Sequence, residues 1–256
     1  MNIIIIIIIL PLLLYILYNL IYKNLEKSQN NIQIDYFVIH MKNSNSDKYN
    51  NIIKNEKILN KKINIYDAII GKDIDLNNFS TIDPNIKFNF KYNYIGEVGC
   101  YLSHLLLIKS LINSNNKYTV IFEDDLEILD ENLDNTINKI ISNLNGNFDI
   151  VYLGNLNNNH NEKVIDNIYT VNKTDALWGT HAYIVNNNNA KKIYDSLLNI
   201  DFAIDNKFYN NINNDIIKVF VIYPILVDQN TNEIKSDIRP QNFESAYKTI
   251  KINNKT

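Results

Sequence analysis

Three consecutive carboxylates, Glu123-Asp124-Asp125, directly follow a strand-favouring run over residues 118–122. An apolar run of this length predicts a buried strand of a mixed or parallel sheet. Ligands of open α/β sheets lie just beyond the carboxyl ends of such strands. Neighbouring carboxylates repel one another unless they are solvated, hydrogen-bonded or bridged by a cation. The triplet therefore indicates a hard divalent ion that holds a phosphorylated ligand, and capping by Asp124 or Asp125 is the alternative.

A second stretch that could contribute to a site opens with Gly96-Glu97-Val98-Gly99 and continues to Ser103-His104. Glycines at the start of a helix let backbone N–H groups approach an anion closely. The alternative is that the glycines serve only the turn and that His104, one turn beyond Cys100, is structural.

Two later segments offer further polar groups. In Trp178-Gly179-Thr180-His181, a turn of small residues leads into a strand, and Thr180 and His181 can form hydrogen bonds. Asp201 and Asp205 are four residues apart, so both face the same side if that segment is helical. Helix capping and a solvated face are the alternative for this pair.

Strand and helix patterns alternate around these residues. Strands are predicted at 34–39, 63–66, 118–122, 148–153, 168–171, 180–185 and 217–223, and helices at 47–59, 97–112, 133–144 and 190–198. Residues 71–94 are irregular and predict a long loop over the site. Alternation of this kind predicts a three-layer α/β domain.

Composition excludes several classes of function. The chain has 256 residues, enough for one large α/β domain with a terminal appendage. A net charge of −3 and the single arginine, Arg239, argue against nucleic-acid binding. The sole cysteine, Cys100, allows no intrachain disulfide. The abundance of Asn and Ile is typical of A/T-rich viral or protist genomes.

The N-terminal residues 1–23 form a separate predicted unit, a single-pass membrane anchor. About 20 uncharged residues, as a helix, match the thickness of a bilayer. A cleaved signal peptide is the alternative, but the segment has neither a basic n-region nor a small-residue cleavage site. We expect a linker at 24–32, a catalytic domain at 33–240 and a tail at 241–256. The anchor places the protein in an endomembrane, or in a virion or host membrane. Lys23 and Lys27 only weakly favour a cytoplasmic catalytic part, so its orientation stays open.

The ordered motifs resemble glycosyltransferase family 25, which includes bacterial lipopolysaccharide sugar transferases and procollagen galactosyltransferases. The resemblance covers about residues 34–240. One departure is Lys48, which stands where the family usually has arginine and offers a point charge in place of a planar fork. The motifs that carry the resemblance are residues 36–40 with Ser46-Asp47-Lys48, 66–72, 96–104, 120–125, 179–184 with Ala190-Lys191-Lys192, 224–229 and Ser236-Asp237-Ile238.

The resemblance implies a GT-A-like α/β fold with a mixed central sheet and an inverting transfer of a hexose, galactose from UDP-galactose, to an acceptor hydroxyl. The acceptor would be a glycan, a lipid-linked saccharide or a collagen-like protein. Glu123 and Asp125 would bind Mn²⁺ or Mg²⁺, which stabilises the departing UDP. Asp205 is the expected general base, and Asp201 and Asp175 are the other candidates. Contacts to the donor or acceptor are expected from His40, Lys48, Gly96, Glu97, Gly99, Ser103, His104, Asp124, Thr180 and His181.

Two other functions stay open at this level. Phosphoryl-transfer domains also place carboxylates at a strand end, but their Asp-x-Asp-x-Thr/Val pattern would need an aspartate at Glu123 and Thr or Val at Glu127. A catalytically silent module that binds a sugar nucleotide is the third possibility.

Overall fold

The computed structural model describes residues 15–18, 32–42, 46–90, 94–231 and 233–235. An eight-stranded mixed sheet runs through this part of the chain, with the strand order β2-β1-β4-β9-β6-β11-β8-β7. The strands are β1 (Ile34–His40), β2 (Asn64–Asp67), β4 (Tyr118–Glu123), β6 (Ile150–Tyr152), β7 (Lys163–Ile165), β8 (Ile168–Thr170), β9 (Ala182–Asn186) and β11 (Val219–Ile222).

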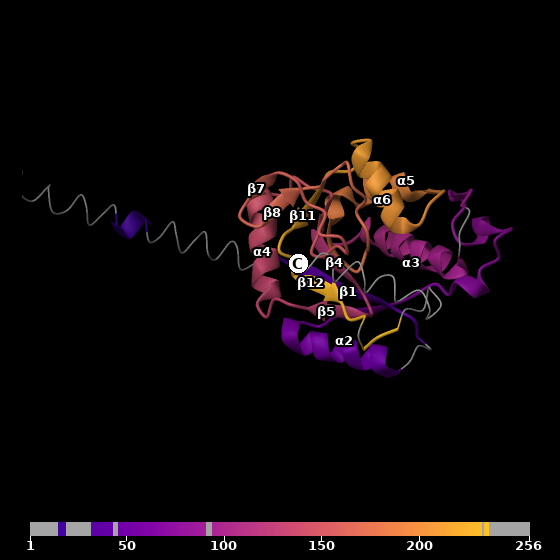
Figure 1. Cartoon of the computed structure of the whole chain (residues 1–256), viewed down its shortest axis with the longest axis horizontal. Coiled ribbons are helices and arrows are strands. Elements are labelled where there is room, and N and C mark those ends of the chain that lie inside the picture. The colour runs from indigo at the N-terminus through magenta and orange to yellow at the C-terminus, as the bar shows by residue number, and fades with distance from the viewer. Residues whose placement is uncertain (1–14, 19–31, 43–45, 91–93, 232, 236–256) are drawn as a thin grey trace, which may run out of the picture.

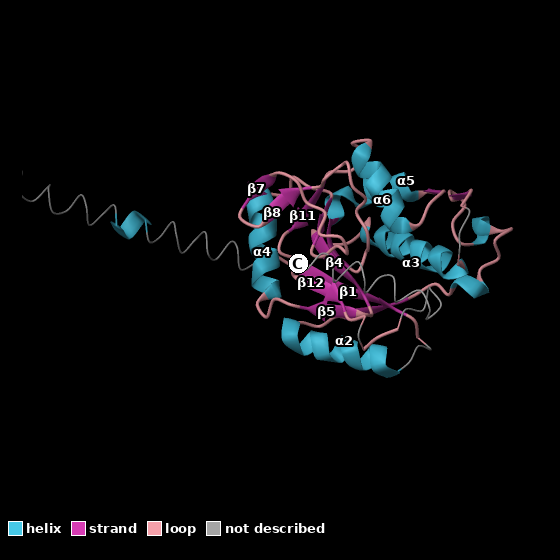
Figure 2. Cartoon of the chain, viewed as in Figure 1, coloured by secondary structure: helices cyan, strands magenta, loops and turns pink. Residues whose placement is uncertain are grey.

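Helices cover both faces of the sheet. On one side lie α3 (Ile95–Leu111), α5 (Ala190–Leu197) and α6 (Ile204–Asn213), which are grouped together in Figure 1. On the other side lie α2 (Ser46–Leu59) and α4 (Leu133–Leu144). Figure 2 shows the strands between the two sets of helices. The predicted three-layer arrangement is confirmed.

The central strands are apolar on both faces because each face contacts a layer of helices. In β4, Ile121 packs into the core beneath α3, α5 and α6, whereas Val120 and Phe122 pack beneath α2 and α4. In β9, Tyr183 packs beneath α3, α5 and α6, and Ile184 packs beneath α2 and α4. This period-two alternation produces the continuous hydrophobic runs seen in the sequence.

Two short strand pairs lie outside the main sheet. β3 (Lys87–Phe88) pairs with β10 (Asn199–Ile200), and β5 (Leu126–Ile128) pairs with β12 (Val227–Gln229). The β5–β12 pair begins directly after the acidic triplet. It therefore draws the segment around residue 227 toward the end of β4.

Several predicted elements need correction. The predicted loop at 71–94 contains two 3₁₀ helices, Gly71–Asp73 and Phe79–Thr81, as well as β3. α6 begins at Ile204, so Asp205 is helical and Asp201 is not, and the two do not share a helix face. β5, β7, β10, β12 and α6 were not predicted, because short strands and a mostly polar helix give weak periodicity.

The predicted anchor, linker and tail lie almost entirely outside the described residues. Of the anchor, only Tyr15–Tyr18 is described, as a short stretch of helix. Within the part of the chain that the structure covers, no helix has the length and apolar character needed to cross a bilayer. The domain limits 33–240 stay a prediction.

Candidate active site

The acidic triplet lies at the carboxyl end of β4, near the middle of the sheet. β1 and β4 run parallel, with Ile39 opposite Glu123. The carboxyl ends of parallel strands meet at one edge of a sheet, so His40, the last residue of β1, lies beside the triplet. The position agrees with the sequence-based prediction of a site beyond this strand.

Asp124 is buried and fully engaged by two basic side chains. His40 Nδ1 lies 2.9 Å from Asp124 Oδ2, and Lys48 Nζ donates to Asp124 Oδ1 at 2.8 Å. All three residues are at most 8% exposed. The sequence predicts that His40, Lys48 and Asp124 contact the donor. In this structure they form an ion cluster that fixes the turn after β4, so donor contact stays a prediction for each.

Asparagines on α2 secure the same turn. Asn51 Nδ2 donates to the carbonyl oxygens of Asp124 (3.1 Å) and Leu126 (2.8 Å). Asn55 accepts from Ile128 N at 3.0 Å and donates to Leu126 O at 3.1 Å. The backbone of the triplet is therefore held rigidly by helix side chains, which satisfies its buried polar groups.

Glu123 points toward α3 and the segment before β9. Its Oε1 accepts from Thr180 Oγ1 at 2.7 Å and lies 3.3 Å from His104 Nε2. Burial acts to raise the pKa of Glu123. The hydrogen bonds from His104 and Thr180 and the charges of His104 and His181 outweigh burial and lower the pKa. Glu123 is therefore a charged carboxylate at neutral pH.

Asp125 is the residue of the triplet whose carboxylate lacks compensation. Its Oδ1 is buried and has no hydrogen-bond partner within the described part of the chain. Burial, followed by the charges of Glu123 and Asp124, raises the pKa of Asp125 to about 8. An orphaned carboxylate oxygen beside a charged carboxylate is a suitable ligand for a hard cation. Glu123 and Asp125 therefore fit Mn²⁺ or Mg²⁺.

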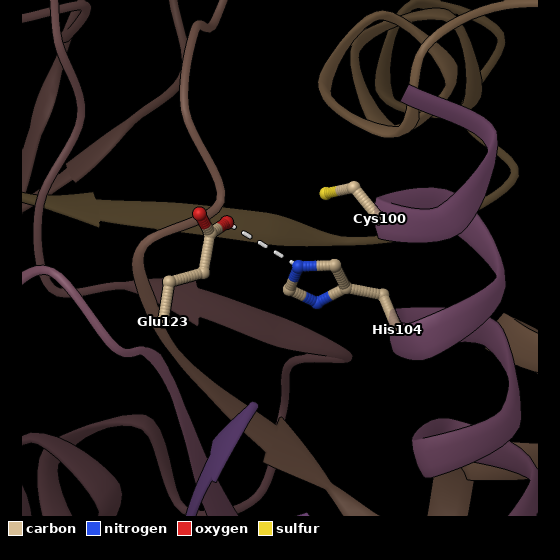
Figure 3. Close-up of side chains that lie close together, drawn as sticks. All are labelled: Cys100, His104 and Glu123. Atoms are coloured by element: carbon tan, nitrogen blue, oxygen red, sulfur yellow. Dashed lines mark hydrogen bonds and ion pairs between the residues drawn. The ribbon is translucent and has the colours of Figure 1, made fainter. Parts of the chain in front are cut away.

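His104 and Cys100 approach the triplet from α3. Figure 3 shows the two side chains on successive turns of the helix, both directed toward Glu123. His104 is fully buried, and its Nδ1 lies 2.8 Å from the hydroxyl of Tyr183. Burial and the charges of four carboxylates raise the pKa of the Cys100 thiol; these are Glu123, Asp205, Asp125 and Glu97. Cys100 thus lies within electrostatic reach of both proposed metal-binding carboxylates, Glu123 and Asp125.

The rest of the predicted anion-binding segment has a packing role in this structure. A Cβ atom at Gly99 would lie 2.5 Å from the carbonyl oxygen of Ile69. Ser103 Oγ accepts from Ile69 N at 2.8 Å and donates to the Gly99 carbonyl at 2.7 Å. Gly99 and Ser103 therefore fasten the segment at 69–71 onto α3. Donor contacts by Gly96, Glu97, Gly99 and Ser103 stay predictions.

The segment before β9 positions Glu123. Gly179 has φ +87°, a left-handed conformation that favours glycine. It is followed by Thr180, which donates to Glu123, and by His181, whose carbonyl oxygen accepts from Glu123 N at 3.0 Å. The His181 side chain is fully buried and its Nε2 donates to the Val227 carbonyl at 3.2 Å. Direct donor contact by Thr180 and His181 is untested.

Among the three candidate bases, Asp205 lies closest to this constellation. It is in the first turn of α6, and its Oδ2 is 3.5 Å from Gly179 N, next to the residue that holds Glu123. Asp201 is paired with Lys207 Nζ at 2.8 Å, so its carboxylate is already engaged by an ammonium group. Asp175 is exposed on the loop before Trp178. The arrangement favours Asp205.

Sequence reasoning missed three contributors: Tyr183 behind His104, and Asn51 and Asn55 behind Asp124. It also did not predict that the Cys100 side chain lies near Glu123. The spacing of Cys100 and His104 was a usable signal. The asparagines gave none, because Asn is abundant throughout the chain and only their contacts with the segment after β4 distinguish these two.

Comparison with known proteins found a family, a characterised relative and solved structures that this chain resembles. Residues 33–208 match the profile of glycosyltransferase family 25 (LPS biosynthesis protein). Procollagen galactosyltransferase 2 of Homo sapiens is 21% identical over 143 residues, which is 52% of this chain and 23% of that protein. The match thus spans less than a quarter of the relative. A structure of a mutant Drosophila beta-1,4-galactosyltransferase 7 with manganese, UDP-Gal and xylobiose superposes with a TM-score of 0.38 and 11% identity, over 82% of this chain and 72% of that one. At that TM-score the superposition supports no residue-level correspondence.

Proposed function

Since the chain belongs to glycosyltransferase family 25 and is therefore a glycosyltransferase, we propose that it is a metal-dependent, inverting enzyme of the GT-A type. It transfers a hexose, galactose from UDP-galactose, to a hydroxyl of a glycan, a lipid-linked saccharide or a collagen-like protein. The galactose donor is supported by the human relative, which is a galactosyltransferase. The mixed sheet with carboxylates at the end of β4 is consistent with a nucleotide-sugar site.

The observation that carries this proposal is the buried Oδ1 of Asp125, which has no hydrogen-bond partner among the described residues and lies beside the charged Glu123. These two side chains would hold Mn²⁺ or Mg²⁺. When bound, the ion neutralises the diphosphate of the donor and stabilises the charge on departing UDP. Asp124 keeps both neighbours in place, because its carboxylate is locked between His40 and Lys48.

Asp205 takes the proton of the acceptor hydroxyl as its oxygen attacks the anomeric carbon and the bond to UDP breaks. Its place at the start of α6, beside Gly179, gives it access to the region that Glu123 faces. Thr180 and His104 maintain the charge and direction of Glu123 throughout.

The test is the variant Asp125→Asn in the full-length chain, assayed with UDP-sugars and Mn²⁺. We expect UDP release to fall by about 100-fold or more, and Mn²⁺-dependent UDP binding measured by calorimetry to disappear, because a metal-ligand charge is lost. Glu127→Gln is the matched control, since Glu127 is exposed two residues further along.

Full activity in Asp125→Asn would refute the metal assignment. Mn²⁺-dependent UDP binding by the unmodified chain, without turnover on any acceptor, would instead identify a silent sugar-nucleotide module.

A further inference from the structure

Cys100, His104 and Glu123 bring three different kinds of metal-binding atom together. Their ligand atoms, a sulfur, an imidazole nitrogen and a carboxylate oxygen, all lie within 4.8 Å of one another. Two come from successive turns of α3 and the third from the end of β4 (Figure 3). Neither Cys100 nor His104 is among the carboxylate ligands of the proposed transferase site.

The spacing of these atoms is close to that of a tetrahedral zinc site. A nitrogen and an oxygen that both ligate tetrahedral Zn²⁺ lie about 3.3 Å apart, and the distance from His104 Nε2 to Glu123 Oε1 is 3.3 Å. A thiolate ligand would lie about 3.5 Å from the other two. The Cys100 sulfur therefore has to move by little more than about 1 Å.

Outer contacts already orient two of the three ligands. His104 Nδ1 lies 2.8 Å from the buried hydroxyl of Tyr183, so Nδ1–H can donate to that oxygen and Nε2, which faces Glu123, is the nitrogen that would bind a metal after losing its proton. Thr180 Oγ1 donates to Glu123 at 2.7 Å. Such second contacts are typical of metal-ligating histidines and carboxylates and raise metal affinity about 10- to 100-fold.

The donor types determine which ion would bind. Thiolate and imidazole prefer borderline metals such as Zn²⁺ and Co²⁺, whereas Mg²⁺ and Mn²⁺ prefer carboxylate oxygens. We propose that Cys100, His104 and Glu123 form a second metal site, selective for Zn²⁺ or Co²⁺. Binding releases the thiol proton of Cys100 and the Nε2 proton of His104 to solvent and forms the metal–sulfur and metal–nitrogen bonds. Three protein ligands leave one coordination position open.

A functional consequence follows if the proposed function also holds. Glu123 is shared between this site and the carboxylate pair with Asp125, so it cannot serve both ions fully. Zn²⁺ would therefore antagonise Mn²⁺-dependent transfer. The soft-metal site would regulate the enzyme through competition for one carboxylate.

The direct test is titration of the untagged full-length chain with Co²⁺, followed by absorption spectroscopy. We expect a thiolate-to-cobalt charge-transfer band in the ultraviolet. Cys100 is the sole cysteine of the chain, so this band can only report Cys100. Cys100→Ser should abolish the band, and Tyr183→Phe should weaken Co²⁺ affinity about tenfold.

Asp125→Asn separates the two proposals. It should retain the cobalt band while losing Mn²⁺-dependent UDP binding, whereas Cys100→Ser should lose the band and retain that binding.

A measurement on the wild-type chain avoids any folding defect of a variant. Zn²⁺ should slow the alkylation of Cys100 at least about tenfold, and Mg²⁺ should not. The absence of a cobalt band in the wild type, or no protection by Zn²⁺, would overturn the second site.

Discussion

Asp124 and Asp125 are adjacent in sequence and yet differ completely in their electrostatic surroundings. Asp124 accepts from His40 and Lys48, while Asp125 has a buried oxygen without a partner in the described part of the chain. Both lie in the turn after β4, and the partners of Asp124 come from the end of β1 and from α2. His40 and Lys48 therefore compensate the charge of one carboxylate and not that of its neighbour.

Lys48 offers the first prediction at the scale of single residues. Lys48→Met leaves the buried Asp124 with His40 as its one basic partner among the described residues, and breaking a buried ion pair costs about 3–5 kcal/mol. We expect a correspondingly lower free energy of unfolding in chemical denaturation. Lys54→Met on the same helix is the control, because Lys54 is exposed. Equal stability of the two variants would remove the structural role assigned to Lys48.

The second prediction at the scale of single residues concerns Asp205. Asp205→Asn removes the proposed base but keeps the shape of the side chain, so we expect kcat to fall by about 10²- to 10⁴-fold. KM for the UDP-sugar should change little, since the base acts on the acceptor. Asp201→Asn is the comparison, and it should retain kcat within about tenfold because Asp201 is paired with Lys207. A larger loss in Asp201→Asn than in Asp205→Asn would reverse the assignment.

At the scale of elements, the segment between α2 and α3 is fastened by one buried carboxylate. Asp83 is fully buried and accepts from Lys109 Nζ of α3 and the hydroxyl of Tyr194 of α5. Burial acts to raise the pKa of Asp83, but these hydrogen bonds outweigh it and lower the pKa from 3.8 to about 2. Asp83 thus connects the irregular segment to both helices on that face of the sheet.

We predict that Asp83→Asn lowers the free energy of unfolding by roughly 1–3 kcal/mol at neutral pH. Because the folded-state pKa lies below the unfolded value, the stabilisation is fully present above about pH 4 and is lost as the pH falls toward about 2. Chemical denaturation at a series of pH values should show that the difference in free energy of unfolding between wild type and Asp83→Asn becomes smaller in acid.

Asp73→Asn serves as the matched control for this experiment, since Asp73 is an exposed aspartate of the same segment. Its stability should follow that of wild type at every pH. The difference in free energy of unfolding between wild type and Asp83→Asn could instead stay constant in acid. That result would show that the charge of Asp83 does not hold the segment against the helices.

At the scale of the whole molecule, we propose that the apolar residues 3–22 anchor the transferase in a membrane. Replacing Ile6 and Leu13 by lysine places two charges in this stretch, each costing about 2.5–3.5 kcal/mol at the centre of a bilayer. We expect the double variant to leave the membrane fraction after an alkaline wash, whereas wild type stays in it. Lysines at Gln29 and Asn31 are the control. Retention of the double variant would exclude this anchor.

The sequence alone determined the three-layer class, the long helices and the edge of the sheet where the site lies. These features follow from local periodicity and from the abrupt change at residue 123, both of which are properties of contiguous residues. The family motifs identified the same acidic triplet and the chain's family. The buried asparagines, β5, β12 and α6 could not be predicted, because their roles depend on burial and on distant partners.

Only the tertiary structure decided how the triplet is divided among its partners. β9 runs antiparallel to β4, so its start brings Thr180 and His181 to the end of β4, while the parallel β1 brings His40 to the same edge. Strand order and direction are set by packing between segments far apart in the chain. For that reason no spacing in the sequence could reveal that Glu123 faces α3, that Asp124 is paired, or that Asp125 Oδ1 has no hydrogen-bond partner in the described part of the chain.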